Sequence, residues 1–221
     1  MLDQFVGDLL TVDLTTGRSG RAALAAEVVR RYLGGRGLNA WRLARLVDAE
    51  TDPLGPANPL IFSCGLLTGT NAPSSSRLHA GARSPLTGLL GSSNVGGHSG
   101  AALRAAGVQT LLLLGRAAEP AVLWIGPTTA ELRPAGDLWG QDTRAATAAL
   151  GGGSARRLLL IGPAGEKLVR YACILTESRH AAGRTGLGAV MGSKNLKAIV
   201  IEAGGRAAGA GRPSERAAIR A

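Results

Sequence analysis

The 221-residue sequence has few aromatic, cysteine and histidine side chains. Aromatic residues make up only 3%, so the core has to be built from small aliphatic side chains and close backbone approaches. Cys64 and Cys173 are too few and too far apart for an iron–sulfur cluster or a structural zinc site, which take about four ligands. We expect two buried free thiols. With 45% hydrophobic residues, the chain can still bury a substantial core.

The chain also lacks long apolar segments. No run approaches the roughly 18 residues that a membrane span requires, and the first residues show no basic segment followed by an apolar one. We therefore expect a soluble, cytoplasmic protein with no membrane partner.

Positive charge exceeds negative charge by ten, but its distribution is uneven. Residues 179–221 carry eight Arg and Lys residues against two acids, which accounts for six of the ten excess charges. No run of five like charges occurs, and the three tryptophans are not interleaved with arginine as a base-stacking platform requires. We expect no nucleic-acid partner; the alternative, a basic face that binds nucleic acid, predicts an affinity that falls steeply with salt.

Residues 179–197 stand out within this basic region. They hold four glycines and five basic groups, counting His180, and no acid. Glycines let a ligand approach the backbone N–H groups, and arginines donate charged hydrogen bonds, so this composition is typical of a phosphate cradle. The spacing fits neither a P-loop nor a dinucleotide-binding turn. A glycine-rich turn that caps a short helix is the alternative.

The rest of the chain reads as short strands and helices joined by polar loops. A hairpin is expected over residues 8–14 with its turn at 15–17, and polar loops over 65–77 and 84–100. The expected helices are 22–33, 38–47, 101–106, 142–150 and 189–191. The expected strands are 60–64, 108–114, 121–125, 157–161, 168–175 and 198–202.

A glycine-rich loop, a small helix and an apolar strand follow one another twice, ending at residues 114 and 202. This order indicates an internal duplication with two similar cradles that face one ligand. The fold class is therefore α+β, with mixed β-sheets, short helices and two related β-rich halves that form a ligand-binding base. We expect one domain over residues 1–203 and a flexible basic tail or linker over 204–221.

Six motifs in order point to a known family. They are Gly34-Gly35-Arg36-Gly37-Leu38, Asp52-Pro53-Leu54-Gly55-Pro56, Gly69-Thr70-Asn71-Ala72-Pro73, Ser84-Pro85-Leu86-Thr87-Gly88, Gly162-Pro163-Ala164-Gly165-Glu166, and Ala181-Ala182-Gly183-Arg184 with the segment from Gly188 to Lys197. With these motifs, the chain from about residue 4 to 203 closely resembles the N-terminal domain of the aldehyde ferredoxin oxidoreductases.

The resemblance implies a base on which two pterins share one tungsten or molybdenum ion, which the pterin sulfurs hold. It implies that Arg77 binds a pterin phosphate and that the carbonyl groups of Asn94 and Ala181 reach a magnesium ion between the phosphates. Without the resemblance, Arg77 reads equally well as a solvated loop residue. The implied cofactor-binding set is Arg77, Asn94, Gly96 and Gly97 from the first cradle and Arg179, His180, Ala181, Ala182, Gly183 and Arg184 from the second.

This chain departs from the family in one motif. Family members often read His-Arg where this chain has Arg179-His180, so the basic contact falls to His180, Arg179 or Arg184. By the resemblance, the 4Fe-4S cysteines and the proton-transfer residues of the family lie in two later helical domains, beyond the stretch that the resemblance covers. His79 and His98, isolated in Gly- and Ser-rich loops, receive no role.

The resemblance therefore implies a pterin-binding module of a tungsten or molybdenum oxidoreductase that converts aldehydes to carboxylic acids with ferredoxin as electron acceptor. Such a module is expected to be inactive without a cluster-bearing subunit or the missing C-terminal domains. Assembly into a homodimer is a further alternative. The alternative is a truncated, non-catalytic remnant or a phosphate-ligand-binding module without redox activity.

Overall fold

The computed structural model describes residues 6–70, 72–153, 155–177 and 180–202. The first half of the chain forms β1 (Asp8–Asp13), β2 (Ser19–Ala23), α1 (Ala26–Tyr32), α2 (Gly35–Leu46), β3 (Leu60–Cys64), β4 (Leu78–Arg83), β5 (Leu90–Val95), α3 (Ser99–Ala105) and β6 (Val108–Leu114). The second half forms β7 (Ala121–Ile125), β8 (Ala130–Pro134), the 3-10 helix η2 (Gly136–Leu138), α4 (Thr143–Ala149), β9 (Arg156–Leu160), α5 (Pro163–Glu166), β10 (Ile174–Thr176), β11 (His180–Ala182), α6 (Leu187–Ser193) and β12 (Leu196–Glu202).

The strands form two mixed, six-stranded sheets with the same topology. Their orders are β2-β1-β6-β3-β4-β5 and β8-β7-β12-β9-β10-β11. In each half, the first strand pairs with its hairpin partner and also runs parallel to the sixth strand. The third, fourth and fifth strands then follow the sixth in antiparallel order. The predicted α+β class and the two related β-rich halves are confirmed.

The two halves match in register as well as in topology. In β6, Gln109 is passed over between two residues that pair with consecutive residues of β1. In β12, Lys197 is passed over in the same way opposite β7. A bulge at one equivalent place in each parallel pair aligns the halves residue by residue.

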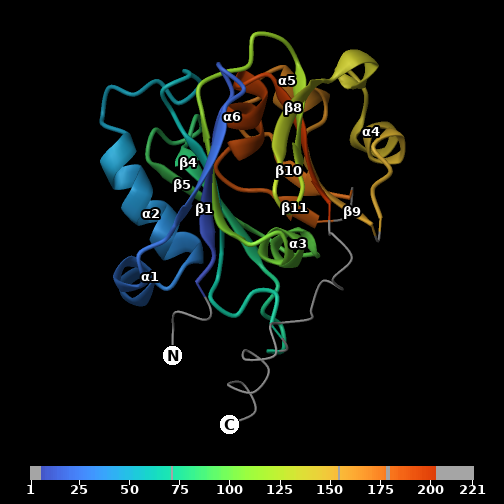
Figure 1. Ribbon diagram of the computed structural model, residues 1–221. Coiled ribbons are helices and arrows are strands. Elements are labelled where there is room, and N and C mark those ends of the chain that lie inside the picture. The colour runs from blue at the N-terminus through green and yellow to red at the C-terminus, as the bar shows by residue number, and fades with distance from the viewer. Residues whose placement is uncertain (1–5, 71, 154, 178–179, 203–221) are drawn as a thin grey trace.

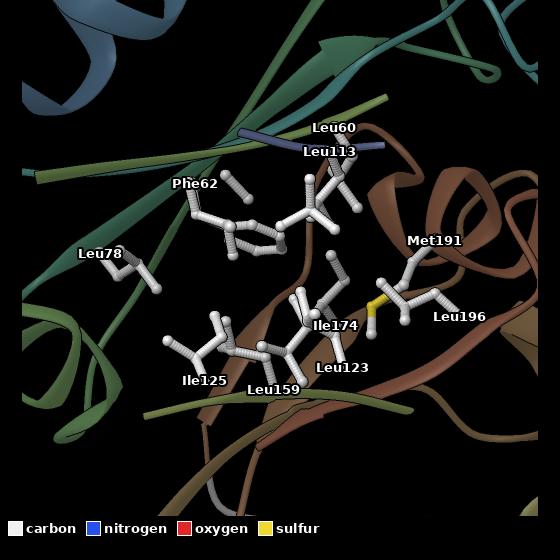
Figure 2. Close-up of a cluster of buried hydrophobic side chains, with 14 of the residues drawn as sticks. Leu60, Phe62, Leu78, Leu113, Leu123, Ile125, Leu159, Ile174, Met191 and Leu196 are labelled. Carbon is white, nitrogen blue, oxygen red and sulfur yellow. The ribbon is translucent and has the colours of Figure 1, made fainter. Parts of the chain in front are cut away.

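The two sheets face each other across the main core, and helices cover their outer faces (Figure 1). Strand alternation sends Leu60 and Phe62 inward, while Ile61 packs outward beneath α2. Figure 2 shows the meeting of the two halves: Phe62, Leu78 and Leu113 of the first sheet lie opposite Leu123, Ile125 and Leu159 of the second. α4 covers the outer face of the second sheet through Ala146 and Leu150.

The structure confirms the hairpin at residues 8–14 and the strands at 60–64, 108–114 and 121–125. It adds four strands that the sequence did not predict, namely β4, β5, β8 and β11. β5 has the sequence LGSSNV, and its inward positions are small because Thr185 and Leu187 of the other half lie against Gly91. Small, polar residues resemble a loop in composition, so the pattern hid a paired strand.

Two predicted elements were wrong in extent. The expected helix over residues 22–33 is shorter: it begins at Ala26, because Ser19–Ala23 pairs with β1 as β2. The expected strand over 168–175 is limited to Ile174–Thr176. Leu168 adopts a left-handed conformation with φ of 57°, which turns the chain after α5.

The longest helix among the described residues, α2, has 12 residues, and none is long and apolar enough to cross a membrane. The predicted tail at 204–221 lies outside the described residues.

Candidate functional site

The fifth strands of the two sheets, β5 and β11, lie against each other where the two halves meet. Asn94 on β5 and Ala181 on β11 line two hollows, one on each side of this contact. The structure therefore brings together the two residues that the sequence predicted to share a magnesium ion, although they are 87 positions apart.

The first hollow has a volume of about 500 Å³. Besides the two shared residues, it is lined by Ser74, Ser76, Arg77, Gly96 and His180. The guanidinium of Arg77 donates from Nη1 to Oδ1 of Asn94 at 3.3 Å, so Asn94 holds this side chain over the hollow. Arg77 and His180 are exposed, which leaves both able to meet a ligand.

The second hollow has a volume of about 390 Å³. It is lined by Arg36, Ser92, Ser93, Gly183 and Arg184 in addition to Asn94 and Ala181. The backbone N–H of Arg184 donates to Oγ of Ser93 at 3.2 Å, which fixes the segment after β11 against β5. At the next residue, the carbonyl oxygen of Thr185 accepts a hydrogen bond from Oγ of Ser84 at 2.8 Å.

Glycines keep the first hollow open next to His180. A Cβ on Gly96 would lie 3.3 Å from Cδ2 of His180, closer than most side chains pack. Gly97 has a φ of 88°, a conformation that strains other residues, and its position faces Nδ1 of His180 and Oγ1 of Thr176. Gly97 itself lines neither hollow.

His79 on β4 contacts the Asn94 side chain. It lies opposite Asn94 in the β4–β5 ladder, and its Nε2 is 3.4 Å from Nδ2 of Asn94. Burial lowers the pKa of His79, and the charges of Arg36 and Arg77 lower it further. A neutral imidazole accepts a hydrogen bond at Nε2, which orients the Asn94 amide so that its oxygen faces Arg77. The sequence alone assigned His79 no role.

The donor set of both hollows suits an anion. Arginine, serine, histidine and glycine line them, and neither lining includes a carboxylate. Oγ of Ser92 is buried and has no hydrogen-bond partner among the described residues, so one donor is left for a guest. No group of three or more His, Cys, Asp or Glu side chains with the geometry of a metal site occurs in the described ranges. Carbonyl oxygens such as those of Asn94 and Ala181 are ligands that magnesium accepts.

The second part of the stretch at 179–197 does not contribute to the hollows. Lys194 and Lys197 are fully buried and donate to protein oxygen atoms: Lys194 to the carbonyl of Gly115 at 2.9 Å, and Lys197 to Gln141 and Glu166. A Cβ on Gly188 or Gly192 would overlap backbone atoms of neighbouring segments. For these residues, the phosphate-cradle interpretation was wrong, because lysines and glycines here serve close packing.

The remaining predicted site residues separate as follows. Ala182 is completely buried in the core, so only its backbone can face a ligand. Arg179 lies outside the described residues. Of the two thiols, Cys64 is buried as predicted. Cys173, directly before β10, is partly exposed, so the prediction of a buried thiol was wrong there.

Sequence reasoning missed five lining residues: Arg36, Ser74, Ser76, Ser92 and Ser93. Arg36 belongs to a motif that carried the resemblance, and the serines lie in two segments that the sequence predicted to be polar loops, one of which contains β5. A third hollow of about 350 Å³ between α2 and the β4–β5 hairpin is mostly apolar, and its Arg83 already donates to the carbonyls of Asp48 and Thr51. It therefore offers no comparable anion site.

Known proteins match this chain over most of its length. The model of the aldehyde ferredoxin oxidoreductase N-terminal domain matches residues 9–203. The chain belongs to this family. It is 41% identical over 199 residues to the tungsten-containing aldehyde ferredoxin oxidoreductases of Thermococcus kodakarensis and Pyrococcus furiosus, covering 89% of this chain and 33% of each relative.

Two further relatives act on other substrates according to their names. The aliphatic sulfonate oxidoreductase, WOR-like subunit, of Pyrococcus furiosus is 33% identical, covering 90% of this chain and 34% of that protein. The active-site complex BamBC of benzoyl coenzyme A reductase, solved with 1,5-dienoyl-CoA, matches with a TM-score of 0.85 and 37% identity over 89% of this chain and 30% of that one. The chain thus spans about a third of the length of the curated relatives it matches.

Proposed function

We propose that this chain is the pterin-cofactor-binding module of a tungsten or molybdenum oxidoreductase. The observation that carries the proposal is the pair of carboxylate-free hollows that meet at Asn94 and Ala181, each lined by residues from both halves of a duplicated fold. A cofactor with two phosphate-bearing pterins needs two such cradles. Membership of the aldehyde ferredoxin oxidoreductase N-terminal family supports the same ligand.

In this proposal, Arg77, Gly96 and His180 bind one phosphate, and Gly183 with Arg184 binds the other. Gly97 and Ala182 contribute through backbone groups, and Arg179, outside the described residues, is kept as a further cofactor-binding residue. The carbonyl groups of Asn94 and Ala181 would hold a magnesium ion, which would offset the negative charge of the phosphates. The bound cofactor supplies the metal centre for a two-electron oxidation, while the chain's own residues bind and orient it.

The reaction of the complete enzyme is a second part of the proposal. We propose that this enzyme oxidises an aldehyde to a carboxylic acid with ferredoxin as acceptor; the support is the 41% identity to relatives that are named tungsten-containing aldehyde ferredoxin oxidoreductases. Related chains named for aldehydes, sulfonates and an acyl-CoA share this domain. We therefore assign substrate choice, the 4Fe-4S cluster and proton transfer to the other two thirds of the enzyme, on a separate subunit or further domains.

Metal and pterin analysis of the chain, purified from a pterin-competent host grown with tungstate or molybdate, tests this function. We expect a pterin signal and stoichiometric metal when the chain is produced with its cluster-bearing partner. Arg77→Ala should lower pterin retention severalfold, whereas Arg133→Ala on β8, an exposed residue paired with Glu131, should not. Absence of both metal and pterin in the wild-type preparations would favour a remnant or a simple phosphate-binding module.

A further inference from the structure

The two hollows are copies of each other under the duplication of the fold. Starting from the residue after each bulge, the paired positions can be followed across each sheet to its fifth strand. In the first sheet the path is Thr110, Ser63, His79 and Asn94; in the second it is Ala198, Leu160, Leu175 and Ala181. Asn94 and Ala181 are therefore equivalent residues.

The lining of the hollows follows this equivalence. One residue before the shared pair, Ser93 corresponds to His180, and two residues after it, Gly96 corresponds to Gly183. The first hollow combines Gly96 with His180, and the second combines Gly183 with Ser93. Each hollow thus takes its glycine from one half and its neighbouring polar residue from the other, as an approximate twofold relationship requires.

The twofold correspondence does not hold for Arg77, the main cation of the first hollow. Arg77 lies two residues before His79, and the equivalent position two residues before Leu175 is Cys173. Cys173 is an uncharged thiol whose Sγ lies 3.9 Å from the carbonyl oxygen of Tyr171. The second hollow therefore lacks the counterpart of Arg77.

Arg36 stands at the second hollow from another element. It is the second residue of α2, whose start is pressed onto β4: a Cβ on Gly35 would lie 2.9 Å from Cδ2 of His79. Asn39 ties the same helix to β4 by donating to the carbonyl oxygen of His79 at 3.0 Å. This tight packing fixes where Arg36 emerges, and its exposed guanidinium pairs with no carboxylate in the described part of the chain.

Ser92 adds an independent observation. Ser92 lines the second hollow, and its buried Oγ has no hydrogen-bond partner among the residues that the structure describes. An unpaired buried hydroxyl costs free energy unless a ligand or water satisfies it.

We infer that Arg36 is the phosphate-binding cation of the second hollow and that it replaces the arginine missing at Cys173, with Arg184 and Ser92 as further donors. The ligand class is a phosphate monoester group. Within the proposed function, on which this inference rests, that group is the phosphate of the second pterin. The two cradles of the duplicated fold are therefore completed by arginines from non-equivalent elements.

Titration of the full 221-residue chain with inorganic phosphate, at constant ionic strength, tests the inference. Backbone amide resonances of Gly96 and Gly183 report the two hollows separately. We expect both to shift saturably in the wild type. Arg36→Gln should weaken the response at Gly183 about tenfold or more and leave Gly96 unchanged, because a charge-assisted hydrogen bond is lost at one site only.

Three further variants should show whether the effect depends on the charge of Arg36 and on its position at the second hollow. Arg77→Gln should show the reverse pattern, and Arg144→Gln, an exposed residue on α4, should change neither response. Arg36→Lys keeps the charge without the planar fork, so its loss should be smaller than that of Arg36→Gln. An unchanged Gly183 curve in Arg36→Gln, or no saturable response at Gly183 in the wild type, overturns the inference.

Failure of the inference differs from failure of the proposed function. If the wild-type chain carries pterin and metal but Arg36→Gln binds phosphate normally, the role assigned to Arg36 is wrong and the proposed function is retained. If the two hollows bind phosphate as expected but no preparation ever contains pterin or metal, the anion site stands and the function is wrong.

Discussion

Lys197 and Gln109 occupy the same bulge in the two halves, and each buried side chain donates to a carbonyl oxygen. Nε2 of Gln109 donates to Cys64 at 2.6 Å, and Nζ of Lys197 donates to Gln141 at 2.7 Å. Lys197 also meets the carboxylate of Glu166, whose other oxygen accepts from the N–H of Gly140 at 2.8 Å. The same position of the duplicated fold thus holds the end of β3 through a neutral amide in one half, and holds Gln141 and α5 through a lysine in the other.

Removal of one partner from the Lys197–Glu166 pair should be strongly destabilising. Both side chains are almost fully buried, with 0% and 5% exposure. Lys197→Met leaves a buried carboxylate unpaired and should lower the free energy of unfolding by about 3–5 kcal/mol, while the double variant with Glu166→Gln should lose less. Urea denaturation of the single and double variants measures this. The exposed Arg133–Glu131 pair is the control, with an expected loss below about 1 kcal/mol; additive effects at Lys197 and Glu166 would contradict the prediction.

Gly192→Ala tests whether packing or helix propensity decides at α6. Propensity alone predicts that alanine stabilises a helix by about 1 kcal/mol relative to glycine. The added Cβ would overlap the carbonyl group of Gly165 in α5, so we expect a net loss of about 1–3 kcal/mol. Thermal unfolding compares it with Gly20→Ala, where nothing lies within 4 Å and stability should change by less than about 0.5 kcal/mol. A more stable Gly192→Ala protein would refute the packing argument.

The buried Lys194 should make stability depend on pH. Burial lowers its pKa from 10.5 to about 8, and the charge of Arg116 contributes. Between these two values the unfolded chain binds the proton and the folded chain does not, so the fold gains stability as pH rises through this window. Relative to Lys194→Met, the free energy of unfolding of the wild type should rise by about 2–3 kcal/mol between pH 7.5 and 10. Urea denaturation at several pH values measures the difference, and a flat difference would show that Lys194 titrates normally.

The two cysteines should differ in reactivity. Complete burial raises the pKa of Cys64 to about 12, so its reactive thiolate is absent at pH 8, whereas Cys173 is partly exposed. A thiol reagent should label one group per native chain, and Cys173→Ser should abolish that labelling. In denaturant, both thiols of the wild type should react. Rapid native labelling of Cys173→Ser would mean that the core around Cys64 opens.

The sequence by itself determined the fold class, the duplication and most of the central strands. Leu60–Cys64, Val108–Leu114 and Ala121–Ile125 are short apolar segments bounded by turn residues, and such segments form strands wherever a core covers both faces. Asn94, Gly96, Ala181 and Gly183 were also found, through motif resemblance, and the structure places all four at the hollows.

Only the tertiary structure decided which basic residues face a ligand. Lys194, Lys197, Arg36 and Arg77 are all basic residues, and their charge alone does not tell which of them is buried. Whether such a side chain turns into the core or onto a hollow depends on residues distant in the chain: Glu166 and Gly115 offer oxygen atoms to the two lysines, while packing of Gly35 on His79 directs Arg36 outward. β5 also became a strand through a long-range cause, since its polar residues pair with β4 and close against the other half. Local pattern records propensity, whereas these outcomes follow from contacts that exist only after the two halves have met.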